Sequence, residues 1–404
     1  MNRLICKRCR AGYLLDDSRW KCDCGSFLDI EFEFSFDIEK IKGRKPTMWR
    51  YREAIPINKD ENIISFNEGF TPLLELTIDG KKVLVKFEQL FPTGSFKDRG
   101  ASVLISKAKE LGVNKVVEDS SGNAGCAIAA YSAKAGIECD IFVPEETSPG
   151  KLAQIQMYGA SLKTIPGSRE DTAHATLEAA KDNFYASHVW NPFFFQGTKT
   201  FAFEIWEQFN FNIPDTLIIP TGHGTLFIGA YLGFKDLLNQ KLISKLPRLI
   251  AVQPEVCAPI YKMFDEKLKE VPRVEPKETM AEGIRIAEPL RAKQILDILA
   301  ETEGGVIIVT EKEIERSLFE ICRNGLYIEP TSAAAIAGFR KYKSTAKEII
   351  VVPLTGHGLK STEKVLKILR KYCKQLVTPI GTADPPAADR LSPSVGSMPV
   401  GSLW

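Results

Sequence analysis

The chain has 404 residues, of which 44 % are hydrophobic and 26 % charged, and its formal net charge is only +2. This length suits two or three domains, and the composition is that of a soluble globular protein with a substantial core. Charges of both signs are mixed along the chain, and no apolar run approaches the roughly 20 residues of a membrane span, which argues against a nucleic-acid groove and a membrane protein. The N-terminus shows no hydrophobic signal segment, so we expect a cytoplasmic protein.

Four of the nine cysteines fall in the first 24 residues, as Cys6-x2-Cys9 and, after a gap of twelve residues, Cys22-x-Cys24. Two knuckles at this separation can converge on one tetrahedral Zn²⁺ through four thiolates. The second knuckle has one spacer residue instead of two, so four reduced cysteines in a small loop-rich module remain the alternative. A zinc ion here would be structural, because four cysteines fill its coordination shell and leave no position for water.

Strand and helix signals alternate over most of the chain. Residues 34–64 are polar and mixed, and we expect them to cross from the cysteine module to the main body. Strands are then predicted at 82–86, 115–118, 139–144, 216–220, 248–253, 305–309 and 348–354, and helices at 96–111, 124–135 and 149–158, with further helices between the later strands. Strands separated by helices predict an α/β protein with parallel sheets and helices on both faces.

The segment from about residue 377 to residue 404 has a different composition. Pro, Gly, Ser and Ala dominate it, and the periodicity disappears. Such a segment buries too little apolar surface to offset its chain entropy. The sequence therefore predicts a disordered tail.

Four loops at predicted strand ends are rich in glycine and small polar residues. In an open parallel sheet, ligands bind at the carboxyl ends of the strands, and glycines let backbone N–H groups come close to a ligand. The loops are 92–100 (PTGSFKDRG), 119–125 (DSSGNAG), 220–225 (PTGHGT) and 354–358 (LTGHG). Each alone could be an ordinary turn, whereas four at successive strand ends indicate one ligand site.

Lys97 lies in the first of these loops, at the start of a predicted helix. The helix dipole disfavours a cation there and should lower its pKa. A nucleophilic amine that forms a Schiff base with a carbonyl cofactor suits this position. The alternatives are a solvent-exposed lysine and a P-loop lysine, although the chain lacks the G-x-x-x-x-G-K-[ST] spacing of a P-loop.

The lysine loop resembles the pyridoxal phosphate (PLP) lysine segment of threonine synthases, within the fold-type II PLP enzymes related to tryptophan synthase β chains. The resemblance spans about residues 65–370, and the cysteine module resembles an appendage of some members. It continues through residues 120–123 (SSGN), 191–200 (NPFFFQGTKT), 329–335 (EPTSAAA) and 354–360 (LTGHGLK).

This resemblance implies two parallel-sheet α/β domains behind an N-terminal zinc-ribbon-like module of residues 1–33. The large, PLP-binding domain would comprise residues 34–96 and 200–376, and the small domain residues 97–199. The resemblance also implies a homodimer.

The resemblance further implies a role for each site residue. Lys97 would bond to PLP and move the proton at the substrate Cα. Asn123 would hydrogen-bond the phenolic oxygen of the cofactor, and Thr355 would face its pyridine nitrogen. A hydroxyl there would leave that nitrogen unprotonated, which favours elimination and replacement over transamination. The cofactor phosphate would lie against Gly222, His223, Gly224 and Thr225, and the substrate carboxylate against Ser120, Ser121 and Gly122.

The reaction implied is that of threonine synthase, a lyase that converts O-phosphohomoserine and water to threonine and phosphate. Two residues depart from the family pattern: Ala124 stands where a hydroxyl residue is typical, and His223 lies in a loop that commonly carries asparagine. A serine/threonine dehydratase or a β-replacement synthase of the cysteine or cysteate kind is therefore the alternative. A non-catalytic PLP-binding homologue is disfavoured by the intact Lys97, Asn123 and Thr355.

Two further groups of residues are candidates for substrate contacts. Residues 281–287 lie where family members place such contacts, although a core strand or helix start is the alternative there. Basic residues that could hold a substrate phosphate are Arg99, Lys151, Arg169 and Lys199, although each of them alone is better explained as a solvated surface charge.

Overall fold

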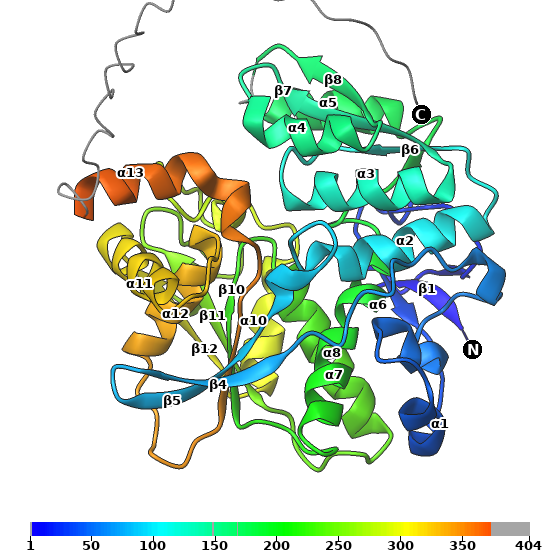
Figure 1. Ribbon diagram of the computed structural model, residues 1–404. Coiled ribbons are helices and arrows are strands. Elements are labelled where there is room, and N and C mark those ends of the chain that lie inside the picture. The colour runs from blue at the N-terminus through cyan, green and yellow to red at the C-terminus, as the bar shows by residue number, and fades with distance from the viewer. Residues whose placement is uncertain (1, 148, 168, 373–404) are drawn as a thin grey trace, which may run out of the picture. The chain divides into compact units, whose positions relative to one another are not determined.

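Three β-sheets and the helices around them make up the computed structural model, which describes residues 2–147, 149–167 and 169–372 (Figure 1). The tail predicted at 377–404 lies outside these residues. Among the residues described, no helix combines the length and the apolar character that a bilayer crossing requires.

The N-terminal module is a three-stranded antiparallel sheet in the order β2-β1-β3. Its strands are β1 (Arg3–Cys6), β2 (Gly12–Leu14) and β3 (Leu28–Glu31). The Arg291 side chain anchors this sheet to the rest of the fold. It donates to the Asp29 carboxylate at 2.7 Å, to the Leu28 carbonyl at 3.0 Å and to the Val189 carbonyl at 3.0 Å.

The segment 34–64 joins the cysteine module to the main body, and it is folded and partly buried. It forms α1 (Ile38–Gly43) and two 3₁₀ turns (Met48–Ala54 and Asp60–Asn62). Ile41, Met48 and Tyr51 are fully buried, and the Tyr51 hydroxyl donates to Glu207 at 2.7 Å. The apolar residues of this segment pack on distant helices, so they show no local periodicity.

The smaller α/β sheet has four parallel strands in the order β8-β7-β6-β9. They are β6 (Lys115–Glu118), β7 (Glu138–Pro144), β8 (Ser161–Ile165) and β9 (Phe184–Tyr185). The helices around it are α2 (Lys97–Glu110), α3 (Asn123–Ala135), α4 (Pro149–Met157), α5 (Arg169–Ala179) and α6 (Pro192–Thr198). Helix α3 packs on β6 and β7, and α2 packs on α3 and α6.

The larger sheet has six strands in the order β12-β11-β10-β13-β5-β4. They are β4 (Leu73–Ile78), β5 (Lys81–Lys86), β10 (Thr216–Pro220), β11 (Arg248–Pro254), β12 (Gly305–Val309) and β13 (Ile350–Pro353). All are parallel except the edge strand β4, which forms an antiparallel hairpin with β5. Continuous apolar runs such as residues 216–220 suit central strands that are covered on both faces.

Helices cover both faces of this sheet, with α8 and α10 on one side and α11 and α12 on the other (Figure 1). The helices are α7 (Thr200–Gln208), α8 (Thr225–Asn239), α9 (Pro259–Asp265), α10 (Ala292–Glu301), α11 (Glu311–Arg323) and α12 (Pro330–Lys341). Three 3₁₀ turns, at Glu88–Leu90, Glu282–Ile284 and Gly358–Ser361, lie in connections. Helix α13 (Thr362–Tyr372) ends the described chain.

The α/β fold with parallel sheets is thus confirmed, and each strand and helix bounded in the sequence is present. The sequence missed the three short strands β1, β2 and β3 of the N-terminal module. It also missed β4, β8 and β9, which are an antiparallel edge strand, a largely exposed strand and a strand of two residues. The boundaries at 33/34, 96/97 and 199/200 stay a prediction.

Candidate active site

The four glycine-rich loops converge at the carboxyl ends of the parallel strands. The first and last loops bond through their backbones, Phe96 N–H to the Thr355 carbonyl at 3.1 Å and His357 N–H to the Gly94 carbonyl at 2.9 Å. Lys97 then links the first loop to the third. The sequence prediction of a single site formed by these loops agrees with this geometry.

Lys97 is the first residue of α2, and its Nζ donates to the Thr225 hydroxyl at 3.0 Å. Burial of the amine lowers the pKa of Lys97 to about 7, and Glu118 and Glu329 partly oppose this shift. The direction agrees with the sequence argument, but burial rather than the helix dipole is the main cause. An amine with such a pKa can accept and donate protons near neutral pH.

The loop 222–225 leads into α8 and forms a cradle for an anion. Gly224 has a φ of +78° and makes no side-chain cap, so the first N–H groups of α8 face the loop without a capping side chain. A Cβ on Gly222 would lie 2.9 Å from the Ile284 Cα, so only glycine fits there. The 3₁₀ turn Glu282–Ile284, within segment 281–287, therefore lies beside this loop. Backbone amides at a helix N-terminus suit a phosphate.

Asn123 and Thr355 both hydrogen-bond Glu329, which was not predicted from the sequence as a site residue. The Glu329 carboxylate accepts from the Asn123 amide at 2.9 Å and from the Thr355 hydroxyl at 2.9 Å. The Ser332 hydroxyl lies 3.0 Å from the Thr355 hydroxyl and accepts from Gly356 N–H at 3.2 Å. Burial raises the pKa of Glu329. Its position directly before Pro330, at the start of α12, was the signal that could have identified it.

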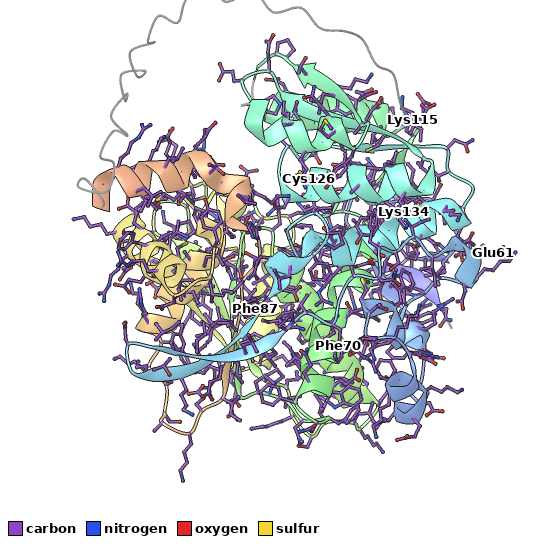
Figure 2. All side chains as sticks on the ribbon, viewed as in Figure 1. Glu61, Phe70, Phe87, Lys115, Cys126 and Lys134 are labelled. Carbon is purple, nitrogen blue, oxygen red and sulfur yellow. The ribbon has the colours of Figure 1, made fainter. Side chains whose placement is uncertain are left out.

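The loop Ser120, Ser121 and Gly122 leads into α3 and is half-buried to exposed, as a substrate-binding loop should be. Gly122 is the N-terminal residue flanking α3 and provides no side-chain cap. A Cβ on Gly125 would lie 1.8 Å from the Ser120 carbonyl oxygen, so the loop and the helix touch at the backbone. Cys126, which is buried, follows within the first turn of α3 (Figure 2).

Comparison with known proteins shows the family to which the chain belongs. Residues 64–356 match the family described as pyridoxal-phosphate dependent enzyme. The threonine synthase of Methanocaldococcus jannaschii is 35 % identical over 379 residues, which cover 90 % of this chain and 94 % of that protein. The chain belongs to the threonine synthase branch of the PLP-dependent enzymes. The threonine synthase of Halalkalibacterium halodurans is 33 % identical over 80 % of this chain and 93 % of that protein.

Solved structures of PLP-dependent enzymes share the fold. Serine racemase from Dictyostelium discoideum has a TM-score of 0.60 and 27 % identity over 72 % of this chain and 92 % of that one. The processed form of threonine deaminase isoform 2 from Solanum lycopersicum has a TM-score of 0.63 and 20 % identity over 85 % and 91 %. The fold-type II assignment is confirmed, and the second likeness concerns the fold alone.

Two of the basic residues considered for a substrate phosphate are buried in ion pairs of the fold. Arg99 is fully buried and bonds Glu88 and Glu204, the latter at 2.6 and 2.7 Å. Lys199 pairs with Asp236 at 2.9 Å. Neither is available to a substrate, so this part of the expectation was wrong. The side chains of Lys151 and Arg169 lie outside the described part of the chain.

Among the described residues, Lys360 is a better candidate for holding a substrate phosphate than Arg99 or Lys199. Its Nζ donates to the Thr93 carbonyl at 2.7 Å and to the Gln154 side-chain oxygen at 2.9 Å, both neutral acceptors. It also lowers the pKa of the Cys126 thiol against the effect of burial, which places it near the first turn of α3.

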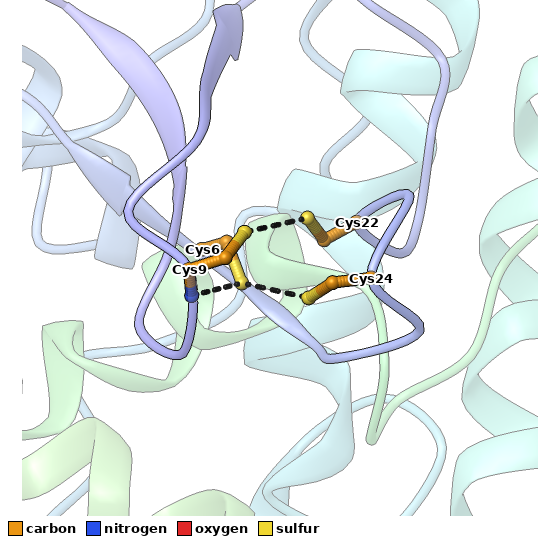
Figure 3. A group of neighbouring side chains, drawn as sticks. All are labelled: Cys6, Cys9, Cys22 and Cys24. Carbon is orange, nitrogen blue, oxygen red and sulfur yellow. Dashed lines mark hydrogen bonds between the residues drawn. The ribbon is translucent and has the colours of Figure 1, made fainter.

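The four N-terminal cysteines form a cluster in the antiparallel module (Figure 3). Their sulfurs all lie within 4.8 Å of one another, with 3.5 Å between Cys6 and Cys24 and 3.4 Å between Cys9 and Cys22. Zinc–sulfur bonds of about 2.3 Å place the corners of a tetrahedron about 3.8 Å apart. The donor set and its spacing therefore fit one Zn²⁺.

Proposed function

We propose that this enzyme is a threonine synthase that converts O-phosphohomoserine and water to threonine and phosphate. The observation that carries the proposal is the buried amine of Lys97, with a pKa of about 7, beside Thr225 at the uncapped start of α8. The relatives that match nearly the whole chain are threonine synthases, which supports this choice of reaction.

The cofactor residues are assigned as follows. Lys97 would bond PLP, the amides of Gly222, His223, Gly224 and Thr225 would hold its phosphate, and Asn123 and Thr355 would contact its ring. PLP, when bound, supplies the electron sink that acidifies the substrate at Cα and then at Cβ. The Lys97 amine moves protons at these carbons, and its depressed pKa suits both directions of transfer.

The second group of residues is assigned to the substrate. Ser120, Ser121 and Gly122, at the start of α3, would bind the substrate carboxylate through N–H and hydroxyl groups. Lys360 would bind the substrate phosphate, because both of its hydrogen-bond acceptors are neutral oxygens that an anion can replace. Lys360→Met should therefore raise KM for O-phosphohomoserine by at least about tenfold, whereas Lys312→Met on the exposed face of α11 should not.

The test of the proposal is a substrate panel with product identification. Holoenzyme would receive O-phosphohomoserine, O-phosphoserine with sulfide or sulfite, serine and threonine in separate reactions. Threonine and free phosphate from the first substrate alone would support the proposal. Ammonia and a 2-oxo acid from serine or threonine as the main products would identify a dehydratase instead.

The structural zinc, the homodimer and the cytoplasmic location are further proposals. The cysteine geometry supports the first, and the family resemblance and the mixed charge of the sequence support the other two. Sedimentation equilibrium of the holoenzyme would measure its mass directly.

A further inference from the structure

Glu118 is a buried carboxylate whose charge acts on Lys97, the proposed reactive lysine. It ends β6, has no exposed surface and bonds the Nδ1 atom of His188 through one oxygen at 2.7 Å. Its second oxygen is buried with no hydrogen-bond partner among the described residues. A buried carboxylate with one oxygen lacking a hydrogen bond destabilises the fold, so such a group calls for a further partner or a function.

Lys97 and His188 both border the ring of Phe194. The Lys97 Nζ lies 5.6 Å from the centre of the Phe194 ring, and the His188 ring lies 6.0 Å from the same centre. His188 also lies 5.9 Å, ring to ring, from His223, which is two residues before the hydroxyl that Lys97 contacts. The charges interact, because Glu118 is the strongest opposite charge acting on the Lys97 amine.

We propose that Glu118, held by His188, is a positioning residue that controls the protonation state of Lys97. Its buried negative charge favours the ammonium form of Lys97, which is the form that returns a proton to a substrate carbon. This inference rests on Lys97 being the reactive lysine of the proposed function.

The charges of Glu118 and Lys97 act on each other. Glu118 raises the pKa of Lys97 against the effect of burial, and Lys97 lowers the pKa of Glu118 against the same effect. The titratable groups that face Glu118 from the surrounding elements are Lys97, Asp119, Cys139, Tyr185 and His188.

The experiment measures the pKa of Lys97 in the full-length chain freed of cofactor. Competitive acetylation over a range of pH, read at Lys97 by mass spectrometry, gives that value without turnover. Glu118→Gln should lower it by about one unit, because the opposing charge is lost. His188→Gln should lower it less, because Glu118 stays but loses its partner. In holoenzyme, the basic limb of the pH–kcat profile should move in the same direction.

Asp140→Asn is the matched control, since Asp140 is a buried carboxylate of the same sheet that pairs with Lys115 instead. The pKa of Lys97 in Asp140→Asn should equal that in the parent. An unchanged Lys97 pKa in folded Glu118→Gln protein overturns the inference. If Glu118→Gln does not fold, a Lys97 pKa in His188→Gln that equals the parental value also overturns the inference. Absence of threonine formation by the parent would instead contradict the proposed function, and the labelling result would be unaffected.

Discussion

The hydroxyl of Thr355 and the carboxylate of Glu329, 26 residues apart in the chain, form a hydrogen bond of 2.9 Å at the centre of the candidate site. The same carboxylate accepts from Asn123. Glu329 thus fixes the orientation of both side chains that are proposed to contact the cofactor ring. A residue with this role affects cofactor binding through its neighbours.

Glu329→Ala should weaken PLP binding about tenfold, because two polar side chains lose the acceptor that orients them. Titration of the cofactor-free chain with PLP, followed by absorbance, measures the dissociation constant. Glu329→Gln keeps one acceptor oxygen and should have a smaller effect. Glu178→Ala, on the exposed side of α5, is the control. Equal affinities in the parent and in Glu329→Ala would contradict the orienting role.

Gly125→Ala should lower kcat/KM about 100-fold. The new methyl group would lie 1.8 Å from the Ser120 carbonyl oxygen, so the loop proposed to bind the substrate carboxylate must move. Gly43→Ala, which meets no atom within 4 Å, is the matched control and should behave like the parent. Steady-state kinetics with O-phosphohomoserine measures the effect, and a parental kcat/KM would show that the loop tolerates the displacement.

The sequence predicted the strands of the sheet interiors because each is a short apolar run bounded by turn residues, such as residues 216–220 before the loop of Gly222. It also predicted which loops would meet, because the carboxyl ends of parallel strands share an edge. The prediction that Lys97 is the reactive lysine could be made from the sequence of its loop alone.

The contacts behind those loops could not be predicted in the same way. Glu118 and His188 are 70 residues apart, and Asn123 and Glu329 are 206 apart. Each pair forms only because the strand order brings the two segments together, and no local pattern encodes that order. The prediction for two of the basic residues, Arg99 and Lys199, was wrong for a related reason: Arg99 looks available in the sequence but turns into the core toward Glu204.

Arg99→Met should lower the free energy of unfolding by about 3–5 kcal/mol, because it leaves Glu88 and part of Glu204 as uncompensated buried charges. Against the effect of burial, Arg99 and Lys86 lower the pKa of Glu204 to about 2. Urea denaturation measures the difference. Arg316→Met removes an exposed ion pair with Glu320 and should cost less than about 1 kcal/mol. A similar loss of unfolding free energy in both variants would mean that the buried ion pairs of Arg99 stabilise the fold no more than an exposed ion pair does.

The buried amine of Lys97 should make the stability of the cofactor-free chain depend on pH. Burial lowers its pKa from 10.5 to about 7, so between these values the unfolded chain binds more protons than the folded chain. The contribution of this group to stability therefore rises with pH through that window, and the full penalty applies below pH 7. Lys97→Met removes the penalty and should be more stable than the parent by about 2–4 kcal/mol at pH 6.

Denaturation of both proteins at several pH values tests this expectation. The difference should shrink as the pH rises from about 7 toward about 10, because the unfolded lysine also loses its proton there. Lys312→Met, on the solvent side of α11, is the control and should follow the parent at every pH. A constant difference between parent and Lys97→Met would mean that packing, not the buried charge, accounts for the change.

The cysteine module should contain one zinc ion per chain, and its removal should destabilise the module. Metal bound only by the folded state adds its binding free energy to folding. A strong chelator should therefore lower Tm by roughly 5 °C or more. It should also change tryptophan fluorescence, because Trp20 packs at 5.1 Å against the rings of both Tyr185 and Trp190. PLP binding should persist, since no cofactor residue lies in the module.

Comparing Cys22→Ser with Cys322→Ser distinguishes the loss of a metal ligand from the loss of a cysteine elsewhere in the chain. Cys22 belongs to the cluster, whereas Cys322 is a half-buried cysteine on α11. Elemental analysis should find zinc in the parent and in Cys322→Ser but little in Cys22→Ser, whose Tm should match that of the chelated parent. Parent protein that contains no zinc after expression with the metal, and that a chelator leaves unchanged, would identify the cluster as four reduced thiols. The module would then depend on its antiparallel sheet and on the contacts of Arg291 for its place in the fold.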